Sequence, residues 1–175
     1  MTWHLNHYRF RAAWEVAAEP SLVYGILCHV ADYPQWWPEV KELRALDDRR
    51  VAVVVRSLLP YELALVVERK REDPAEGLLE VFLHGDVEGV ARWKLSPSAK
   101  GTRVVFEEEA RLRKRLMRYL APVARPAFLA NHALMMRSAE KGLRAFLAGA
   151  RWSNVGRSVV SPPERISQGA RSGVG

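Results

Sequence analysis

The residues most able to do chemistry in this 175-residue chain are Asn131 and His132, two adjacent polar residues in an otherwise apolar stretch. An imidazole can exchange a proton near neutral pH, and an amide can orient a ligand or stabilise an enolate oxygen. One interpretation is therefore catalytic, with His132 moving a proton in an aldol-type ring closure and Asn131 assisting. The other is structural, because a histidine on an apolar helix face is usually a core residue with a hydrogen-bond partner.

A carboxylate at Glu108 could complete such a site. It falls on the same face of its predicted strand as Phe106 and Ala110. Arg56 raises a similar question, because nearly all its neighbours are apolar and a buried unpaired charge is very costly. We expect partners for both, either Arg56 with Glu108 or Glu108 with His132; otherwise Glu108 would lie at the mouth of a pocket.

A second group of titratable residues lies in the segment 85–89, Gly-Asp-Val-Glu-Gly, which follows His84. It could be a catalytic pair if Asp86 or Glu88 pointed inward with a raised pKa. It also fits a hairpin turn, because type I turns favour Asp at the first position and Gly at the fourth. We prefer the turn.

The element that must position Asn131 and His132 is a helix predicted over 126–149. Pro126 suits a first helical turn, and Gly149 suits a helix end. Apolar spacings of three and four between them predict one buried stripe. This stripe comprises Phe128, His132, Met135, Ala139, Leu143 and Phe146.

The segments upstream have mainly strand-like patterns. The predicted strands cover 8–18, 40–46, 51–58, 61–71, 78–84, 90–96 and 102–112. Short helical segments are predicted at 22–30 and 114–120, with a helix or turn at 32–38. One long helix cannot fill a strongly curved sheet, so we expect a pocket roofed by the helix near Asn131 and His132.

Large apolar side chains are expected to form the core or to line this pocket. The candidate lining residues are Trp14, Trp37, Tyr61, Trp93, Phe106, Phe128 and Met135. The adjacent Trp36 and Trp37 cannot point the same way, so we expect one to anchor its loop and the other to face the pocket entrance.

The net charge of +7 does not indicate a nucleic-acid partner. The segment 150–175 contributes +3, with four arginines against one glutamate. The other basic clusters, at 69–71 and 111–115, fit solvated faces, and no nucleic-acid-binding motif accompanies them. The five histidines lack metal-ligand spacing, so we expect neither a metal nor a cofactor.

Composition favours a single cytoplasmic domain. Cys28 is the only cysteine, which excludes an intramolecular disulfide. No secretory signal is expected in 1–10, and the apolar stretch 119–136 contains Arg125 and two prolines, which argues against stable membrane insertion. We expect a folded domain at 1–149 and a basic, mostly disordered tail at 150–175, where packing residues are sparse.

Several ordered segments resemble a known superfamily. They are Pro20-Ser21-Leu22-Val23-Tyr24 with 32–38, then 85–89 with Arg92-Trp93, Gly101-Thr102, and Asn131-His132 with Met135-Met136. Over about residues 8–148 the chain resembles the START-like superfamily called SRPBCC, in its polyketide cyclase/dehydrase-like group.

This resemblance implies an α+β helix-grip fold of the START/Bet v 1 type. About seven antiparallel strands would curve around the long C-terminal helix and enclose an apolar cavity. The superfamily includes cyclases, lipid carriers and hydrolases, so fold alone does not decide activity. Members generally bind hydrophobic or aromatic small molecules without a cofactor.

We therefore expect binding of a lipid-like, aromatic or polyketide-like molecule in the cavity. The first alternative is a cofactor-independent cyclase or dehydratase, with His132 as acid-base and Asn131 or Glu108 assisting. The second is an accessory protein that binds a partner in its groove. A closed apolar cavity with no inward titratable group would favour carriage, and a histidine–carboxylate pair inside the cavity would favour catalysis. An open groove flanked by Trp36 and exposed apolar surface would favour a partner.

Overall fold

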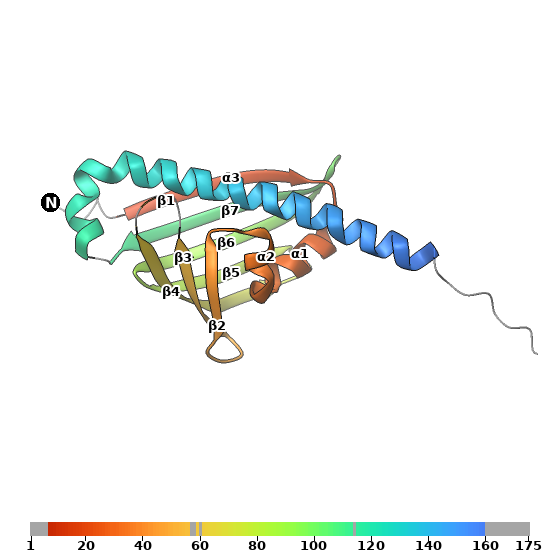
Figure 1. Ribbon diagram of the computed structural model, residues 1–175, viewed down its shortest axis with the longest axis horizontal. Coiled ribbons are helices and arrows are strands. Elements are labelled where there is room, and N and C mark those ends of the chain that lie inside the picture. Colours follow the sequence, from red (N-terminus) through yellow and green to blue (C-terminus); the bar gives the residue numbers. More distant parts are fainter. Residues whose placement is uncertain (1–6, 57–58, 60, 114, 160–175) are drawn as a thin grey trace, which may run out of the picture.

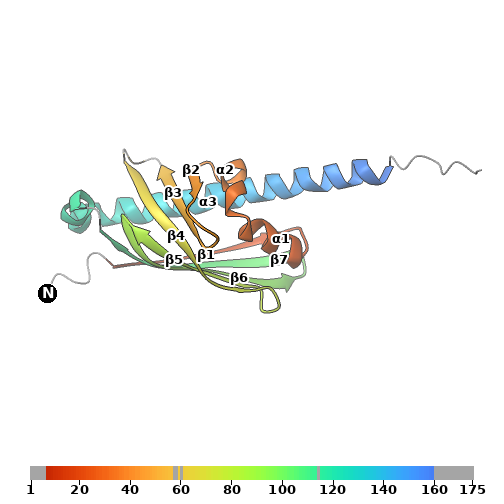
Figure 2. The ribbon, with the colours of Figure 1, turned by 90° about the horizontal axis from the view of Figure 1, so that it is seen from below.

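Seven antiparallel strands form one curved sheet, and a long helix crosses its concave face (Figures 1 and 2). The computed structural model describes residues 7–56, 59, 61–113 and 115–159. In chain order the elements are β1 (His7–Val16), α1 (Pro20–Cys28), the 3-10 helix η1 (Val30–Asp32), α2 (Tyr33–Trp36), β2 (Val40–Ala45), β3 (Arg50–Arg56), β4 (Glu62–Asp73), β5 (Leu78–Gly85), β6 (Val87–Ser98), β7 (Gly101–Leu112) and α3 (Arg115–Val159). The predicted α+β helix-grip architecture is confirmed.

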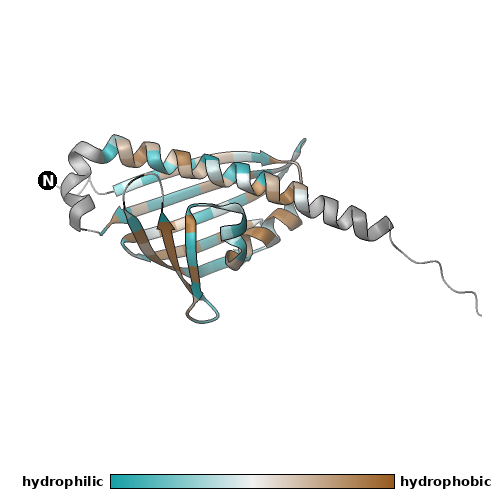
Figure 3. Cartoon of the chain, in the orientation of Figure 1, coloured by the Kyte–Doolittle hydropathy of each residue, from teal (hydrophilic) through white to brown (hydrophobic). Residues whose placement is uncertain are grey.

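The sheet is an open meander from β2 to β7, and the first strand, β1, is added at the edge beside β7. Its order is β1-β7-β6-β5-β4-β3-β2, and β1 joins β7 rather than its sequence neighbour. Hydrophilic and hydrophobic residues alternate along the strands (Figure 3), because successive side chains point to opposite faces. One face therefore packs under the helices and the other carries charge.

Basic residues of the chain lie on the outer face of the sheet, where they pair with acidic side chains. Arg9 pairs with Glu109 at 3.1 Å, and Arg11 pairs with Glu107 at 3.4 Å, across β1 and β7. Exposed pairs of this kind contribute little stability individually.

The long helix extends beyond the predicted bounds of 126–149 at both ends. α3 has 45 residues, begins at Arg115 and continues past Gly149 to Val159. Its first turns run at an angle to the rest (Figure 1), as expected where prolines remove helical hydrogen bonds. The proposed division at 149/150 stays a prediction, and residues 160–175 lie outside the described residues.

The turn at 85–89 is tighter than a simple hairpin loop. The last β5–β6 pair is Leu83 with Gly89, yet β5 continues to Gly85 and β6 already begins at Val87. This is possible because Gly85 pairs with β4 and Val87 pairs with β7. The residues on either side of Asp86 therefore stay paired within the sheet, Gly85 with β4 and Val87 with β7, although they do not pair with each other.

The core is filled where the later turns of α3 meet α2 and the sheet. Trp14 and Trp93 meet there with ring centroids 5.3 Å apart, and Leu143 of α3 is fully buried. Gly142 allows a close approach, because a Cβ at this position would collide with the backbone oxygen of Trp36 in α2. α3 is therefore held against the sheet at this end.

Candidate functional site

A pocket of about 240 Å³ lies between the sheet and α3, where the concave face is not filled. Alternate residues of three strands form its aliphatic floor, since every second side chain of a strand shares one face. These residues are Val51, Val53, Val55, Leu63, Leu65, Val67, Leu79, Val81 and Leu83. A pocket with this lining suits an apolar molecule.

Six of the seven predicted lining residues are in the pocket wall. They are Trp37, Tyr61, Trp93, Phe106, Phe128 and Met135. The structure places Trp14 elsewhere, which corrects that prediction. Trp14 is 4% exposed and packs against Trp93, which, together with Phe106, lines the pocket.

The rings of Trp36 and Trp37 stack on each other, with centroids 5.7 Å apart and planes 25° apart, which corrects the expectation that the two point in different directions. Their surroundings nevertheless differ. Trp36 is 2% exposed and is buried beside Gly142, so it anchors α2 against α3. Trp37 lines the pocket.

His132 and Glu108 meet inside the pocket. Their Nε2 and Oε2 atoms are 3.2 Å apart, and their side chains are only 18% and 14% exposed. The imidazole also stacks on Phe10 of β1, with centroids 3.6 Å apart and planes 13° apart. The ring is thus fixed by one carboxylate and one aromatic ring, an arrangement that can hold and transfer a proton.

The alternative pairing of Glu108 with Arg56 is wrong. Arg56 lies opposite Glu62 in the β3–β4 register and pairs with it at 3.6 Å. Both side chains are more than half exposed, so Arg56 carries no buried charge.

Asn131 is buried beside His132 and lines the same pocket. Its Nδ2 donates a weak hydrogen bond to the sulfur of Met135 at 3.6 Å. Its Oδ1 is buried and accepts no hydrogen bond from the described residues. All three predicted catalytic candidates therefore converge on one pocket, and their roles stay predictions.

Tyr8 belongs to this group and was missed in the sequence analysis. It is 2% exposed, lines the pocket and packs against Phe10 and Phe128. Burial raises the pKa of Tyr8, and the charge of Arg125 opposes that shift. Extending the alternation of Phe10, Ala12 and Trp14 by one step would have placed Tyr8 on the inner face.

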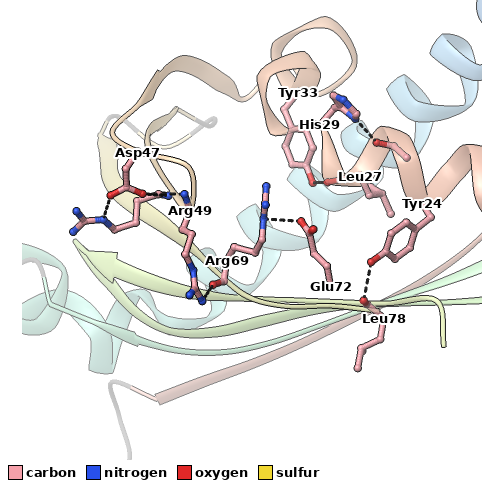
Figure 4. A network of polar contacts seen from close by, with 11 residues as sticks. Tyr24, Leu27, His29, Tyr33, Asp47, Arg49, Arg69, Glu72 and Leu78 are labelled. Carbon is pink, nitrogen blue, oxygen red and sulfur yellow. Dashed lines mark hydrogen bonds and ion pairs between the residues drawn. The ribbon is translucent and has the colours of Figure 1, made fainter. Parts of the chain in front are cut away.

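A charged rim borders another part of the pocket (Figure 4). Arg69 pairs with Glu72 at 2.7 Å, and Arg49 donates to the backbone oxygen of Arg69 at 3.0 Å. Arg69 continues the inward row of Leu63, Leu65 and Val67, a signal that the sequence contained. The hydrogen bond from Arg49 to Arg69 connects the β2–β3 turn to β4.

The carboxylates of the 85–89 turn do not line the pocket. Asp86 Oδ2 accepts a hydrogen bond from the backbone nitrogen of Ala64 at 3.0 Å, and Glu88 pairs with Arg113 at 3.2 Å. Both contacts support the structural interpretation of this turn.

The match to a family model covers residues 7–150, most of the chain. That family is described as polyketide cyclase/dehydrase and lipid transport. The chain belongs to this family. The resemblance to the polyketide cyclase/dehydrase-like group of SRPBCC is thereby confirmed. No curated protein sequence matches the chain.

Two solved structures illustrate the similarity of fold. The Zhui aromatase/cyclase from Streptomyces sp. R1128 is 16% identical with a TM-score of 0.68, covering 79% of this chain and 92% of that one. A START superfamily protein from Mycobacterium smegmatis is 18% identical with a TM-score of 0.66, covering 81% of this chain and 98% of that one. At this identity the likeness concerns the fold alone.

Two further observations concern the described residues of this protein. None of its helices there is long and apolar enough to cross a membrane. Within the same residues, no cluster of three or more His, Cys, Asp or Glu side chains could hold a metal ion.

Proposed function

We propose that this protein binds a hydrophobic small molecule, lipid-like or aromatic, in the pocket under α3. The observation that carries this proposal is the pocket of about 240 Å³ with an aliphatic floor and aromatic walls. An unfilled apolar void lowers stability, so a molecule that fills it is bound favourably.

The family supports the same proposal. Its description names polyketide cyclase, dehydrase and lipid-transport functions, and the lipid cargo of the last is an apolar small molecule. One structural neighbour is titled an aromatase/cyclase. A cytoplasmic location and the absence of a nucleic-acid partner stay predictions from the sequence.

The test is native mass spectrometry of protein purified from its own host. We expect a co-purified apolar molecule, and we expect Ala91→Phe to reduce its occupancy because Ala91 lines the pocket. Val53→Phe, from the pocket floor, provides a second filling variant. The matched control is Ala64→Phe, which adds the same ring at an exposed position outside the pocket lining.

Repeated purification without any bound molecule would count against binding. Equal occupancy in folded Ala91→Phe, Val53→Phe and Ala64→Phe proteins would place the ligand elsewhere. Circular dichroism establishes which variants are folded.

A second candidate function is cofactor-independent cyclisation or dehydration. The pairing of His132 with Glu108 inside the pocket favours it, since a buried histidine–carboxylate pair can transfer protons. In an aldol closure, His132 would remove a proton next to a carbonyl, the resulting enolate carbon would attack a second carbonyl, and the same proton would return to the new alkoxide. Asn131 would orient the ligand.

His132→Ala distinguishes this candidate from carriage. Loss of turnover of a ligand that still binds supports catalysis, whereas unchanged turnover of every accepted substrate rejects it. The accessory-protein alternative has less support, because Trp36 is buried and does not flank an open groove.

A further inference from the structure

One end of the pocket contains two buried polar atoms without a hydrogen-bond partner among the described residues. These are the Oη of Tyr8 and the Oδ1 of Asn131. The two side chains belong to residues that are 2% and 9% exposed, so water has little access. A buried polar group left unpaired costs about 1–3 kcal/mol, and a suitable ligand group would remove that cost.

Both atoms belong to what we call the His132 end, formed by Tyr8, Phe10, Phe128, Asn131 and His132, all of which line the pocket. The Tyr8 ring lies 5.9 Å from Phe10 and 6.4 Å from Phe128, between centroids. Phe10 in turn stacks on His132. Asn131 follows Phe128 by three residues on α3, a spacing that places both on one helix face.

The chemistry of the two atoms restricts the group that satisfies both. The amide oxygen of Asn131 can only accept a hydrogen bond, whereas the hydroxyl of Tyr8 can donate and accept. A ligand hydroxyl can donate to Asn131 while accepting from Tyr8. An ether or ketone oxygen has no hydrogen to donate and would leave the Asn131 oxygen unpaired.

A carboxylate is disfavoured at this end for a different reason. It would place a second negative charge near Glu108, which already uses His132 as its partner. Arg125 lies over the Tyr8 ring, 4.8 Å from its centroid, but is not among the residues that line the pocket. Burial of a charge without a partner in the lining is costly, so a neutral group fits this end best.

The walls indicate what the hydroxyl is attached to. Phe10, Phe106 and Phe128 present aromatic rings around the His132 end, which favours stacking or edge contacts with a planar molecule. The volume of about 240 Å³ is below the range of about 300–1,000 Å³ for drug-sized ligands. A compact ring system matches this space.

We propose that the His132 end selects a neutral hydroxyl group on a compact aromatic ligand, with the hydroxyl donating to Asn131 Oδ1 and accepting from Tyr8 Oη. This inference rests on the proposed binding function and specifies its ligand class. It is independent of whether His132 performs catalysis.

The probes are 2-naphthol, 2-methoxynaphthalene, naphthalene and 2-naphthoate, titrated at pH 7 with tryptophan fluorescence as the readout. We expect 2-naphthol to bind roughly tenfold more tightly than naphthalene, as one net hydrogen bond of about 1.4 kcal/mol implies. The methoxy compound lacks the donor and should bind less tightly than 2-naphthol. The carboxylate should bind most weakly.

Tyr8→Phe and Asn131→Leu should each reduce the ratio of 2-naphthol affinity to naphthalene affinity, the quantity that reports the hydroxyl contact. The matched control is Tyr24→Phe, because Tyr24 is outside the pocket lining and donates to the backbone oxygen of Leu78 at 3.1 Å (Figure 4). It removes an equivalent hydroxyl and should keep the wild-type preference.

The outcomes separate this inference from the proposed function. If no probe of any kind binds, the binding proposal fails and this inference fails with it. If all four probes bind equally, or if Tyr8→Phe and Asn131→Leu keep the wild-type preference, binding stands and hydroxyl selection is overturned. The wild-type series decides the matter even if a variant does not fold.

Discussion

Glu80 illustrates how a single residue depends on its neighbours in this sheet. It is a 6%-exposed carboxylate on β5, and Arg92 of β6 contacts it at 2.6 Å, with Lys70 of β4 at 3.7 Å. The hydrogen bond from Arg92 is the main cause that lowers the pKa of Glu80. The outer face therefore contains one buried charge among many exposed ones.

We predict that Arg92→Met lowers the free energy of unfolding by roughly 1–3 kcal/mol at pH 7, because Glu80 loses its principal partner. Since the folded-state pKa of Glu80 is lowered, its contribution is present above the ordinary glutamate pKa of about 4.3 and is lost as the pH falls through the folded value. Urea unfolding from pH 7 to pH 3 measures both effects, and the acid-dependent loss should be smaller in the variant.

The matched control for Arg92→Met is Arg9→Met. Arg9 pairs with Glu109, but their side chains are 83% and 68% exposed, so no measurable loss is expected. Equal losses in the two variants would contradict the distinction between buried and exposed pairs.

At the scale of elements, α3 is held by contacts that its own periodicity does not reveal. The sequence stripe correctly includes Phe128, Ala139 and Leu143, which are buried. However, Met136 and Leu147 are buried more deeply than their neighbours Met135 and Phe146. The contact with α2 sets the rotation of α3 about its own axis, because Gly142 must face the backbone of Trp36.

We predict that Gly142→Ala reduces stability by roughly 1–3 kcal/mol, the usual cost of overpacking. The added methyl group would meet the Trp36 backbone, which cannot move like the end of a flexible side chain. Thermal and urea unfolding monitored by circular dichroism measure the change.

Gly149→Ala makes the same substitution in the same helix, where no atom beyond the adjoining helix backbone and the two neighbouring residues lies within 4 Å of the added methyl position. It should leave stability unchanged or raise it, because alanine is the better helix former. Similar destabilisation at both positions would reject the close-contact explanation.

At the scale of the whole molecule, several elements contribute buried or partly buried tyrosines to the interior. Burial raises the pKa of Tyr24 in α1 to about 12 and that of Tyr61 to about 12. It also raises the pKa values of Tyr8 and Tyr33. These residues connect the pocket, the short helices and the sheet.

We predict that stability falls as the pH rises from about 10 towards 12. The unfolded tyrosines ionise near pH 10, whereas those in the folded protein stay protonated to higher pH. Their contribution is therefore complete below pH 10 and is lost through the folded pKa values. Urea midpoints from pH 8 to pH 11.5 measure the fall.

Tyr61→Phe should make that decline shallower, because it removes one group that ionises earlier in the unfolded chain. A decline equally steep in wild type and variant would assign the alkaline sensitivity to other groups.

The sequence by itself determined the succession of strands and helices along the chain and the placement of His132 and Asn131 on the long helix expected to roof a pocket. Local periodicity suffices for this, because it states which side of each element is buried. The helix-grip fold followed from the resemblance to SRPBCC, not from periodicity. The sequence allowed two partners for Glu108, His132 and Arg56, and did not distinguish between them.

Only the tertiary structure decided which half of the concave face is filled and which polar atoms remain unpaired. Trp14 lies outside the pocket lining and packs against Trp93 of the pocket wall, while Tyr8, six residues earlier on β1, lines the pocket. Sheet curvature and the register between distant strands determine these outcomes, and neither is encoded in the spacing within one segment. For the same reason, the shared position of Tyr8 and Asn131 became visible only once β1 and α3 were placed together.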